Sequence, residues 1–115
     1  MAGTSDLHDD CEAVHRALAL FGRAWAGAVL WAMLDGADRF SLIRDAVPGV
    51  SDAVLTARLR DLCAHGLAER LVEAGPPTSV RYVATPAGRD ARRLLRAIRD
   101  YARRHPDLFR SGAGG

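Results

Sequence analysis

Lysine is absent from this chain, and all sixteen of its basic residues are Arg. Cysteine is scarce: Cys11 and Cys63 lie far apart, which excludes a disulfide framework and the ligand spacing of a zinc finger. The longest apolar run, Ala24 to Leu34, is too short to span a bilayer, and the polar segment Met1 to Asp10 lacks a signal-peptide pattern. These absences exclude a secreted scaffold and a membrane protein, and they favour a protein of the reducing cytoplasm.

The chain has the composition of one ordinary globular domain, with 115 residues of which 49% are hydrophobic and 26% charged. Its net charge of +2 conceals a gradient. Residues 1–38 carry two Arg against six acidic residues, residues 39–70 carry five against four, and residues 71–115 carry nine against four. This asymmetry favours a polyanionic partner for the second half of the chain.

Two helices are predicted in the first third of the chain. Val14 and Leu18 share one face of a helix over about residues 12–22. A second helix over about residues 24–34 is apolar nearly all round, so we expect it to be the buried central helix. The aromatic residues expected in the core are Phe21, Trp25 and Trp31.

The next segment has the pattern of a helix-turn-helix. Ser41 is a suitable N-cap for a third, short helix, and Arg39-Phe40 before it is expected to be one small strand or an extended entry. Pro48-Gly49 forms a tight turn, and Ser51 caps a fourth helix over about residues 52–65. A short helix, a tight turn and a second helix make a helix-turn-helix candidate.

The rest of the chain predicts a β-hairpin and a final helix. Residues 67–73 and 80–84 have the pattern of two strands joined by a Pro-stiffened tip. Thr85 followed by Pro86 starts a helix over about residues 86–105. The apolar residues of that helix have the spacing of a helix that packs against another helix, and we interpret this side as a dimer interface. The predicted fold class is therefore mainly α with a small β-hairpin, a winged helix-turn-helix.

An ordered set of short motifs runs from about Val14 to Arg89. They are Leu20-Phe21-Gly22-Arg23-Ala24-Trp25, Leu34-Asp35-Gly36 with Arg39-Phe40, Val47-Pro48-Gly49-Val50-Ser51, Leu55-Thr56-Ala57-Arg58-Leu59-Arg60-Asp61-Leu62, Gly66-Leu67-Ala68-Glu69-Arg70, and Tyr82-Val83-Ala84-Thr85 before Gly88. This set resembles the HxlR family of bacterial winged-helix transcriptional regulators, relatives of the MarR group. The resemblance implies a homodimer formed through the terminal helices that binds a palindromic operator, as a repressor or an activator. It also implies that some members sense aldehydes, quinones or oxidants through a cysteine near the first helix.

Three positions depart from the family pattern. Cys11 lies fourteen positions before Trp25, whereas the family has its cysteine thirteen before that tryptophan, where this chain has Glu12. The usual Lys before the tryptophan is Ala24 here, and the hairpin tip lacks positive charge. The first departure weakens the case for thiol sensing, and the last weakens contacts from the wing to phosphate.

The fourth helix is the candidate recognition helix. At about 100° per residue, Leu55, Leu59 and Leu62 form an inward stripe. The opposite side then presents Arg60, the best candidate for a guanine edge or a phosphate. The full set of expected DNA contacts is Arg39, Arg44, Ser51, Ala53, Thr56, Ala57, Arg58, Arg60, Thr78 and Arg81. An ordinary solvated surface would explain each of these residues in isolation, and the helix-turn-helix context favours DNA.

Arg58 and the Arg-rich face of the last helix each allow two interpretations. Arg58 lies about 60° from the leucine stripe, so it either pairs with an acidic residue or reaches sideways to a phosphate. The Arg-rich face of the last helix is either solvated or paired with the acidic first helix, and direct DNA contact is the less favoured interpretation.

Cys11 is the candidate redox sensor, with His15 on the same helical face. Its acidic neighbours lower a thiol's reactivity, whereas a helix N-terminus acts in the opposite direction. Cys63 is expected to be a half-buried packing residue. Nothing in the sequence resembles a catalytic triad or an oxyanion arrangement, so we expect no enzyme, no metal site and no cofactor.

These patterns together predict a sequence-specific, double-stranded-DNA-binding transcriptional regulator, a homodimer controlled by a small molecule or a redox signal. Residues 11–105 are expected to form the DNA-binding domain, and residues 1–10 and 106–115 to be flexible. The alternative is a winged-helix module for protein–protein association without DNA binding. The weakly charged hairpin and the small net charge favour this alternative, and a salt-sensitive gel shift separates the two.

Overall fold

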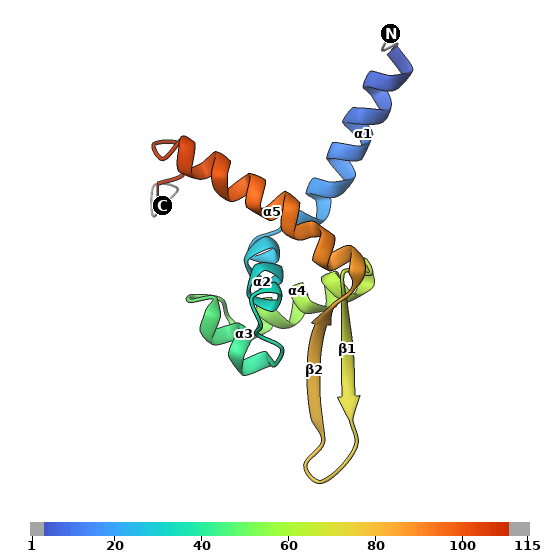
Figure 1. Ribbon diagram of the computed structural model, residues 1–115, viewed down its shortest axis with the longest axis vertical. Helices are drawn as coiled ribbons and strands as arrows, with labels where there is room; N and C mark the ends of the chain where they lie inside the picture. Colours follow the sequence, from blue (N-terminus) through green and yellow to red (C-terminus); the bar gives the residue numbers. More distant parts are fainter. Residues whose placement is uncertain (1–3, 111–115) are drawn as a thin grey trace.

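The structure of the protein, a computed structural model, describes residues 4–110 and contains five helices and one hairpin within that range (Figure 1). The elements in chain order are α1 (Thr4–Phe21), α2 (Ala26–Leu34), α3 (Phe40–Ala46), α4 (Asp52–Ala64), β1 (Ala68–Glu73), β2 (Ser79–Ala84) and α5 (Pro86–Arg104). This order is that of a winged helix-turn-helix, in which α3 and α4 form the helix-turn-helix and the β1–β2 hairpin is the wing. The predicted fold class is confirmed.

The core forms where α2 packs against both α4 and α5. Val29 and Leu30 of α2 are fully buried, as are Leu55 and Leu62 of α4. The inward leucine stripe and the buried central helix are therefore confirmed. Trp25 differs from the expectation of a core aromatic, because its side chain is 39% exposed at the edge of the core.

Some helix boundaries differ from the predicted ones. The first helix begins at Thr4, so residues 4–10, which were expected to be flexible, are helical. No glycine or proline interrupts the chain between Thr4 and Phe21, and Leu7 continues the apolar face of Val14 and Leu18 toward the N-terminus. Residues 1–3 and 111–115 lie outside the described residues.

One further expectation, that Ser41 caps the third helix, is wrong. Arg39, not Ser41, precedes the first turn of α3: its backbone is extended, and no side-chain hydrogen bond caps the helix. Residues 106–110, which were expected to be flexible, form a turn beyond α5. The centre of the Phe109 ring in this turn lies 5.8 Å from the centre of the Tyr101 ring of α5. An aromatic contact of this kind holds the turn against the helix.

The predicted caps of α4 and α5 are present. The Ser51 hydroxyl accepts a hydrogen bond from the Val54 amide at 3.2 Å, and the Thr85 hydroxyl accepts one from the Gly88 amide at 3.1 Å. The Thr85 hydroxyl also donates to the Gly66 carbonyl oxygen at 2.6 Å. Gly66 has a φ of 77°, which glycine adopts without steric cost at the end of a helix. These bonds join the start of α5 to the end of α4.

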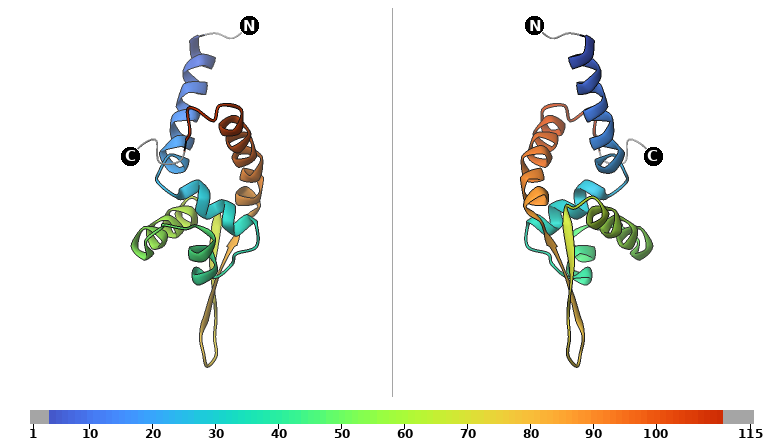
Figure 2. Two further views of the ribbon diagram at one scale, coloured as in Figure 1. Left: turned by 90° about the vertical axis from the view of Figure 1, so that its left-hand side faces the viewer. Right: turned by 90° about the vertical axis from the view of Figure 1, so that its right-hand side faces the viewer.

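The wing is an antiparallel hairpin in which Ala68 pairs with Ala84 and Glu73 with Ser79. Its tip points away from the helices, at the end of the molecule opposite to the N-terminus of α1 (Figures 1 and 2). The Tyr82 amide donates to the Asp38 carbonyl oxygen at 2.8 Å. This bond holds the base of the wing against the loop before α3, and that loop is the expected extended entry rather than a strand.

The terminal helices expose apolar side chains. α1 extends from the body of the molecule, and the second half of α5 extends in another direction (Figure 1). The exposed apolar residues on these helices are Leu7, Val14, Leu18, Leu94, Ile98 and Tyr101. Within residues 4–110, no single helix is long and apolar enough to cross a membrane; only α1 and α2 taken together pass that test, with a bend of 77° between them.

Candidate nucleic-acid interface

The outer face of α4 carries small side chains and one Arg. Ala53, Arg60 and Ala64 are exposed, and Thr56 and Ala57 are half-buried. Because the three inward leucines fix the rotation of the helix, these five residues lie on the side away from the core, as predicted. Small side chains allow a helix backbone to approach a groove closely, so Arg60 is the residue of this face with the longest polar reach.

Arg60 shares an open groove with the wing. The groove has a volume of about 460 Å³ and lies between α4 and the hairpin, with Thr56, Arg60, Arg70 and Tyr82 among its lining residues. Arg60 and Arg70 are both exposed, and neither makes an ion pair or side-chain hydrogen bond to another residue of the described chain. Two free guanidinium groups beside one groove create a positive site for a polyanion.

Arg70 was not among the predicted contacts, although the strand pattern contained the signal. Side chains alternate between the two faces of a strand, and Arg70 lies two residues from Ala68, which is buried against the body. The paired residue on β2 is Tyr82, which also lines the groove. The even-numbered positions of β1 therefore face α4.

Arg81 lies on the other face of the wing. It pairs with Leu71 across the hairpin, and its Nε lies 3.0 Å from a carboxylate oxygen of Asp38. The Arg81 guanidinium therefore joins the wing to the loop before α3, and its contact with DNA stays a prediction. Thr78, at the tip, donates from its hydroxyl to the Gly75 carbonyl oxygen at 3.3 Å and is exposed.

Three predicted phosphate contacts surround the helix-turn-helix. Arg39 is exposed and has no side-chain partner among residues 4–110. The Arg44 guanidinium lies 3.4 Å from the Asp52 carboxylate, and both side chains are exposed, so this pair is weak. Ser51 accepts its capping bond through the hydroxyl oxygen, which leaves the hydroxyl proton available for a phosphate at the start of α4.

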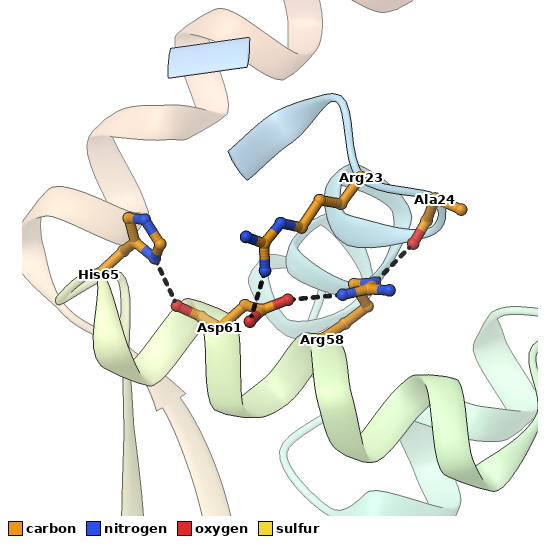
Figure 3. A network of polar contacts seen from close by, with 5 residues as sticks. All are labelled: Arg23, Ala24, Arg58, Asp61 and His65. Atoms are coloured by element: carbon orange, nitrogen blue, oxygen red, sulfur yellow. Dashed lines mark hydrogen bonds and ion pairs between the residues drawn. The ribbon is translucent and has the colours of Figure 1, made fainter. Parts of the chain in front are cut away.

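Arg58 belongs to an internal polar network (Figure 3). Its Nε donates to the Ala24 carbonyl oxygen at 2.9 Å, and its Nη1 lies 2.6 Å from the Asp61 carboxylate. The Arg23 guanidinium lies 2.8 Å from the other carboxylate oxygen of Asp61. Of the two roles left open for Arg58, the structure shows the ion pair, and a contact with DNA stays a prediction.

The same network perturbs the ionisation of Asp61. Hydrogen bonds from Arg23 and then from Arg58 hold the pKa of its carboxyl below the ordinary value. His65 completes the group, with its Nδ1 2.9 Å from the backbone oxygen of Asp61. The network joins the segment between α1 and α2 to the middle of α4, so it fixes the position of the candidate recognition helix.

The two cysteines lie in different surroundings. Cys11 is exposed on α1. Cys63 is half-buried on α4, as expected, and burial raises the pKa of its thiol. No group of three or more metal-ligating side chains occurs among residues 4–110.

The comparisons with known proteins agree with this arrangement. Residues 20–108 match the HxlR-like helix-turn-helix family. The HTH-type transcriptional regulator YdeP of Bacillus subtilis is 30% identical over 104 residues, which are 90% of this chain and 80% of YdeP.

Two solved structures are similar over most of their length. The redox regulator HypR in its reduced form has a TM-score of 0.76 at 30% identity, over 85% of this chain and 97% of HypR. Quinone-bound YodB from B. subtilis has a TM-score of 0.67 at 25% identity, over 79% of this chain and 94% of YodB. The protein is therefore a transcriptional regulator of the helix-turn-helix type and belongs to the HxlR-like helix-turn-helix family.

Proposed function

We propose that this regulator binds a palindromic double-stranded DNA operator as a homodimer, with α4 of each copy in the major groove. The observation that carries the proposal is the groove between α4 and the wing, where Arg60 and Arg70 are exposed and free of partners in the described chain. A guanidinium donates two hydrogen bonds to the edge of a guanine or to a phosphate.

The two arginines have different proposed roles. Arg60 lies on α4 among alanines, so it follows the helix into the groove and reads a base edge. Arg70 lies on the wing beside α4, where it contacts the DNA backbone. Arg39 and Ser51 are proposed to add phosphate contacts at the start of α3 and at the start of α4. Phosphate contacts position a protein on DNA, whereas base contacts select the sequence.

The dimer is proposed to form through α1 and α5. Val14 and Leu18 of α1 are more than half exposed in the single chain, and Ile98 of α5 is 48% exposed. The helices also have opposite charge: α1 carries four carboxylates against one Arg, and α5 carries seven Arg against two Asp. Packing α1 of one copy on α5 of the other buries the apolar residues and brings the opposite charges together. Two α4 helices about 34 Å apart then fit successive major grooves.

The test is footprinting of the full chain on the DNA upstream of its own gene, with random-sequence competitor. Specific binding predicts one protected, two-fold symmetric site that resists the competitor and weakens as salt rises. Protection that random DNA removes equally well would contradict the proposal and favour the protein-association alternative. Because the target is DNA, a cytoplasmic location is part of the same proposal.

A second proposal is control of this binding through the Cys11 thiol. Cys11 is exposed on the same face of α1 as Leu7 and Val14, which we place in the dimer interface. HypR is described as a redox regulator, and YodB has been solved bound to quinone. The Cys11→Ser variant is expected to bind DNA normally but to ignore 1,4-benzoquinone and diamide, which release the wild type. Identical release of both proteins would contradict this role.

A further inference from the structure

A hollow of about 600 Å³ lies between α2 and the turn that joins α3 to α4. Its walls include both tryptophans of the chain, Trp25 and Trp31, and the backbone turn at Val47 and Pro48. The volume falls within the range of sites that hold small organic molecules. The hollow lies apart from the groove that we assign to DNA, because the two share no lining residue.

The lining selects the chemistry of a ligand. Four alanines leave the indole rings of Trp25 and Trp31 as the bulky apolar groups of the walls, and Asp35 is the only ionisable residue that lines the hollow. Asp35 is exposed at the end of α2, and its carboxylate has no side-chain partner in the described part of the chain. Indole faces attract cations and stack on flat rings, and a carboxylate adds attraction for positive charge.

Trp31 already accepts a cation in this structure. The Arg99 guanidinium of α5 lies 5.6 Å from the centre of the Trp31 ring. Arg99 does not line the hollow and instead lines a separate one together with Trp31, so its contact shows only that this indole accepts a cation. We propose that the hollow is a binding site for a small aromatic cation, which stacks on the two indoles and pairs with Asp35.

The backbone at Trp25 connects this site with the helix-turn-helix. Trp25 has a φ of 74°, a left-handed conformation that is strained for a bulky residue, and such strain is common at ligand sites and switches. Its ring lies close to Gly49, within the turn before α4: a Cβ added at Gly49 would be 3.4 Å from the indole. A ligand that moves Trp25 therefore presses on the turn that positions α4. This coupling, unlike the binding itself, depends on the proposed DNA-binding function.

Binding is tested on the DNA-free protein by titration with benzyltrimethylammonium while tryptophan emission is recorded. Because both tryptophans line the hollow, occupancy changes the whole intrinsic signal. We expect a saturable change with benzyltrimethylammonium, a smaller one with neutral benzyl alcohol and none with benzoate. Asp35→Asn should weaken binding of the cation about two- to fivefold, as the loss of one exposed ion pair implies. Asp45→Asn removes an exposed carboxylate outside the hollow and should leave the affinity unchanged.

Three results would overturn the assignment: no saturable change with the cation, equal binding of benzoate, or equal affinity of Asp35→Asn and wild type. Ala46→Leu, which fills the hollow from α3, provides a second variant and should also reduce binding. Circular dichroism verifies that each variant is folded. A footprint measured with and without the cation then tests the coupling. A protein that binds the cation but no DNA would refute the proposed function and leave the site intact.

Discussion

The Arg23 guanidinium lies 2.8 Å from the Asp61 carboxylate, which joins the short segment between α1 and α2 to the C-terminal part of α4 (Figure 3). Arg58 binds the same carboxylate and also the Ala24 carbonyl oxygen of that segment. The candidate recognition helix α4 is thus held from its inner side by leucines and from one edge by charges. The network therefore connects the segment that follows α1, the proposed dimer helix, with the candidate recognition helix.

The first prediction concerns this connection. Asp61→Asn removes the negative charge that both arginines share, so Arg23 and Arg58 lose their ion pairs and α4 is held less firmly. We expect a lower thermal midpoint and a several-fold weaker affinity for the operator, although Asp61 lies outside the proposed DNA interface. Asp90→Asn, on the exposed side of α5, is the matched control and should change neither quantity. Equal effects of the two substitutions would contradict the role of the network.

The second prediction is a pH dependence. The pKa of Asp61 lies below its ordinary value of 3.8 in the folded protein, so the unfolded chain takes up this proton first as the pH falls. The stabilisation is therefore complete above about pH 4 and is lost as the pH falls through the lowered pKa. Urea unfolding midpoints of wild type and Asp61→Asn should differ at neutral pH and converge under acid conditions. A difference between the two midpoints that grows as the pH falls would contradict the predicted direction of the pH dependence.

The third prediction tests the junction between α4 and α5. A Cβ at Gly88 would overlap the Leu67 carbonyl oxygen more closely than atoms approach without bonding. Because the clash is with backbone rather than with a flexible side chain, Gly88→Ala should reduce the free energy of unfolding by about 2 kcal/mol. Asp90→Ala, two residues along the same helix, should stay within about 0.5 kcal/mol. Chemical denaturation measures both values. An unchanged free energy of unfolding for Gly88→Ala would contradict the prediction, because it would show that the backbone at Leu67 can shift to make room for the Cβ.

The fourth prediction concerns assembly. Leu18 is 57% exposed in the single chain and lies in the proposed dimer interface. Leu18→Glu places a charge in that interface and should shift the protein to the monomer in analytical ultracentrifugation. Ala13→Glu adds the same charge on another face of α1, and this variant should remain dimeric. Dimeric Leu18→Glu, or a monomeric wild type, would contradict the proposed interface.

The features that the sequence predicts well are those with a local physical cause. Ser51 and Thr85-Pro86 mark helix starts through their own chemistry, and the periodic leucines determine which side of α4 is buried. The start of α3 was misplaced because Ser41 suggested a side-chain cap, whereas the chain enters this helix from the extended Arg39 without one.

The roles of the arginines depend on contacts that sequence spacing does not contain. Arg81 pairs with Asp38 from the neighbouring loop, and Arg58 reaches Ala24 across 34 positions. Both partners become adjacent only after the wing and α2 have packed, so sequence spacing does not predict these two contacts. The left-handed backbone of Trp25 has no sequence signal either, since non-glycine residues rarely adopt it.

Fluorescence anisotropy with the footprinted operator and with random DNA, at two salt concentrations, tests most directly whether the outer face of α4 reads DNA. Arg60→Ala should lose about tenfold in operator affinity and discriminate less against random DNA, whereas Arg70→Ala should weaken binding to both and reduce the salt dependence. Arg110→Ala, which removes an exposed Arg beyond the end of α5, should bind as the wild type does. Operator binding by Arg60→Ala that equals the wild type would contradict the proposal that the outer face of α4 reads DNA.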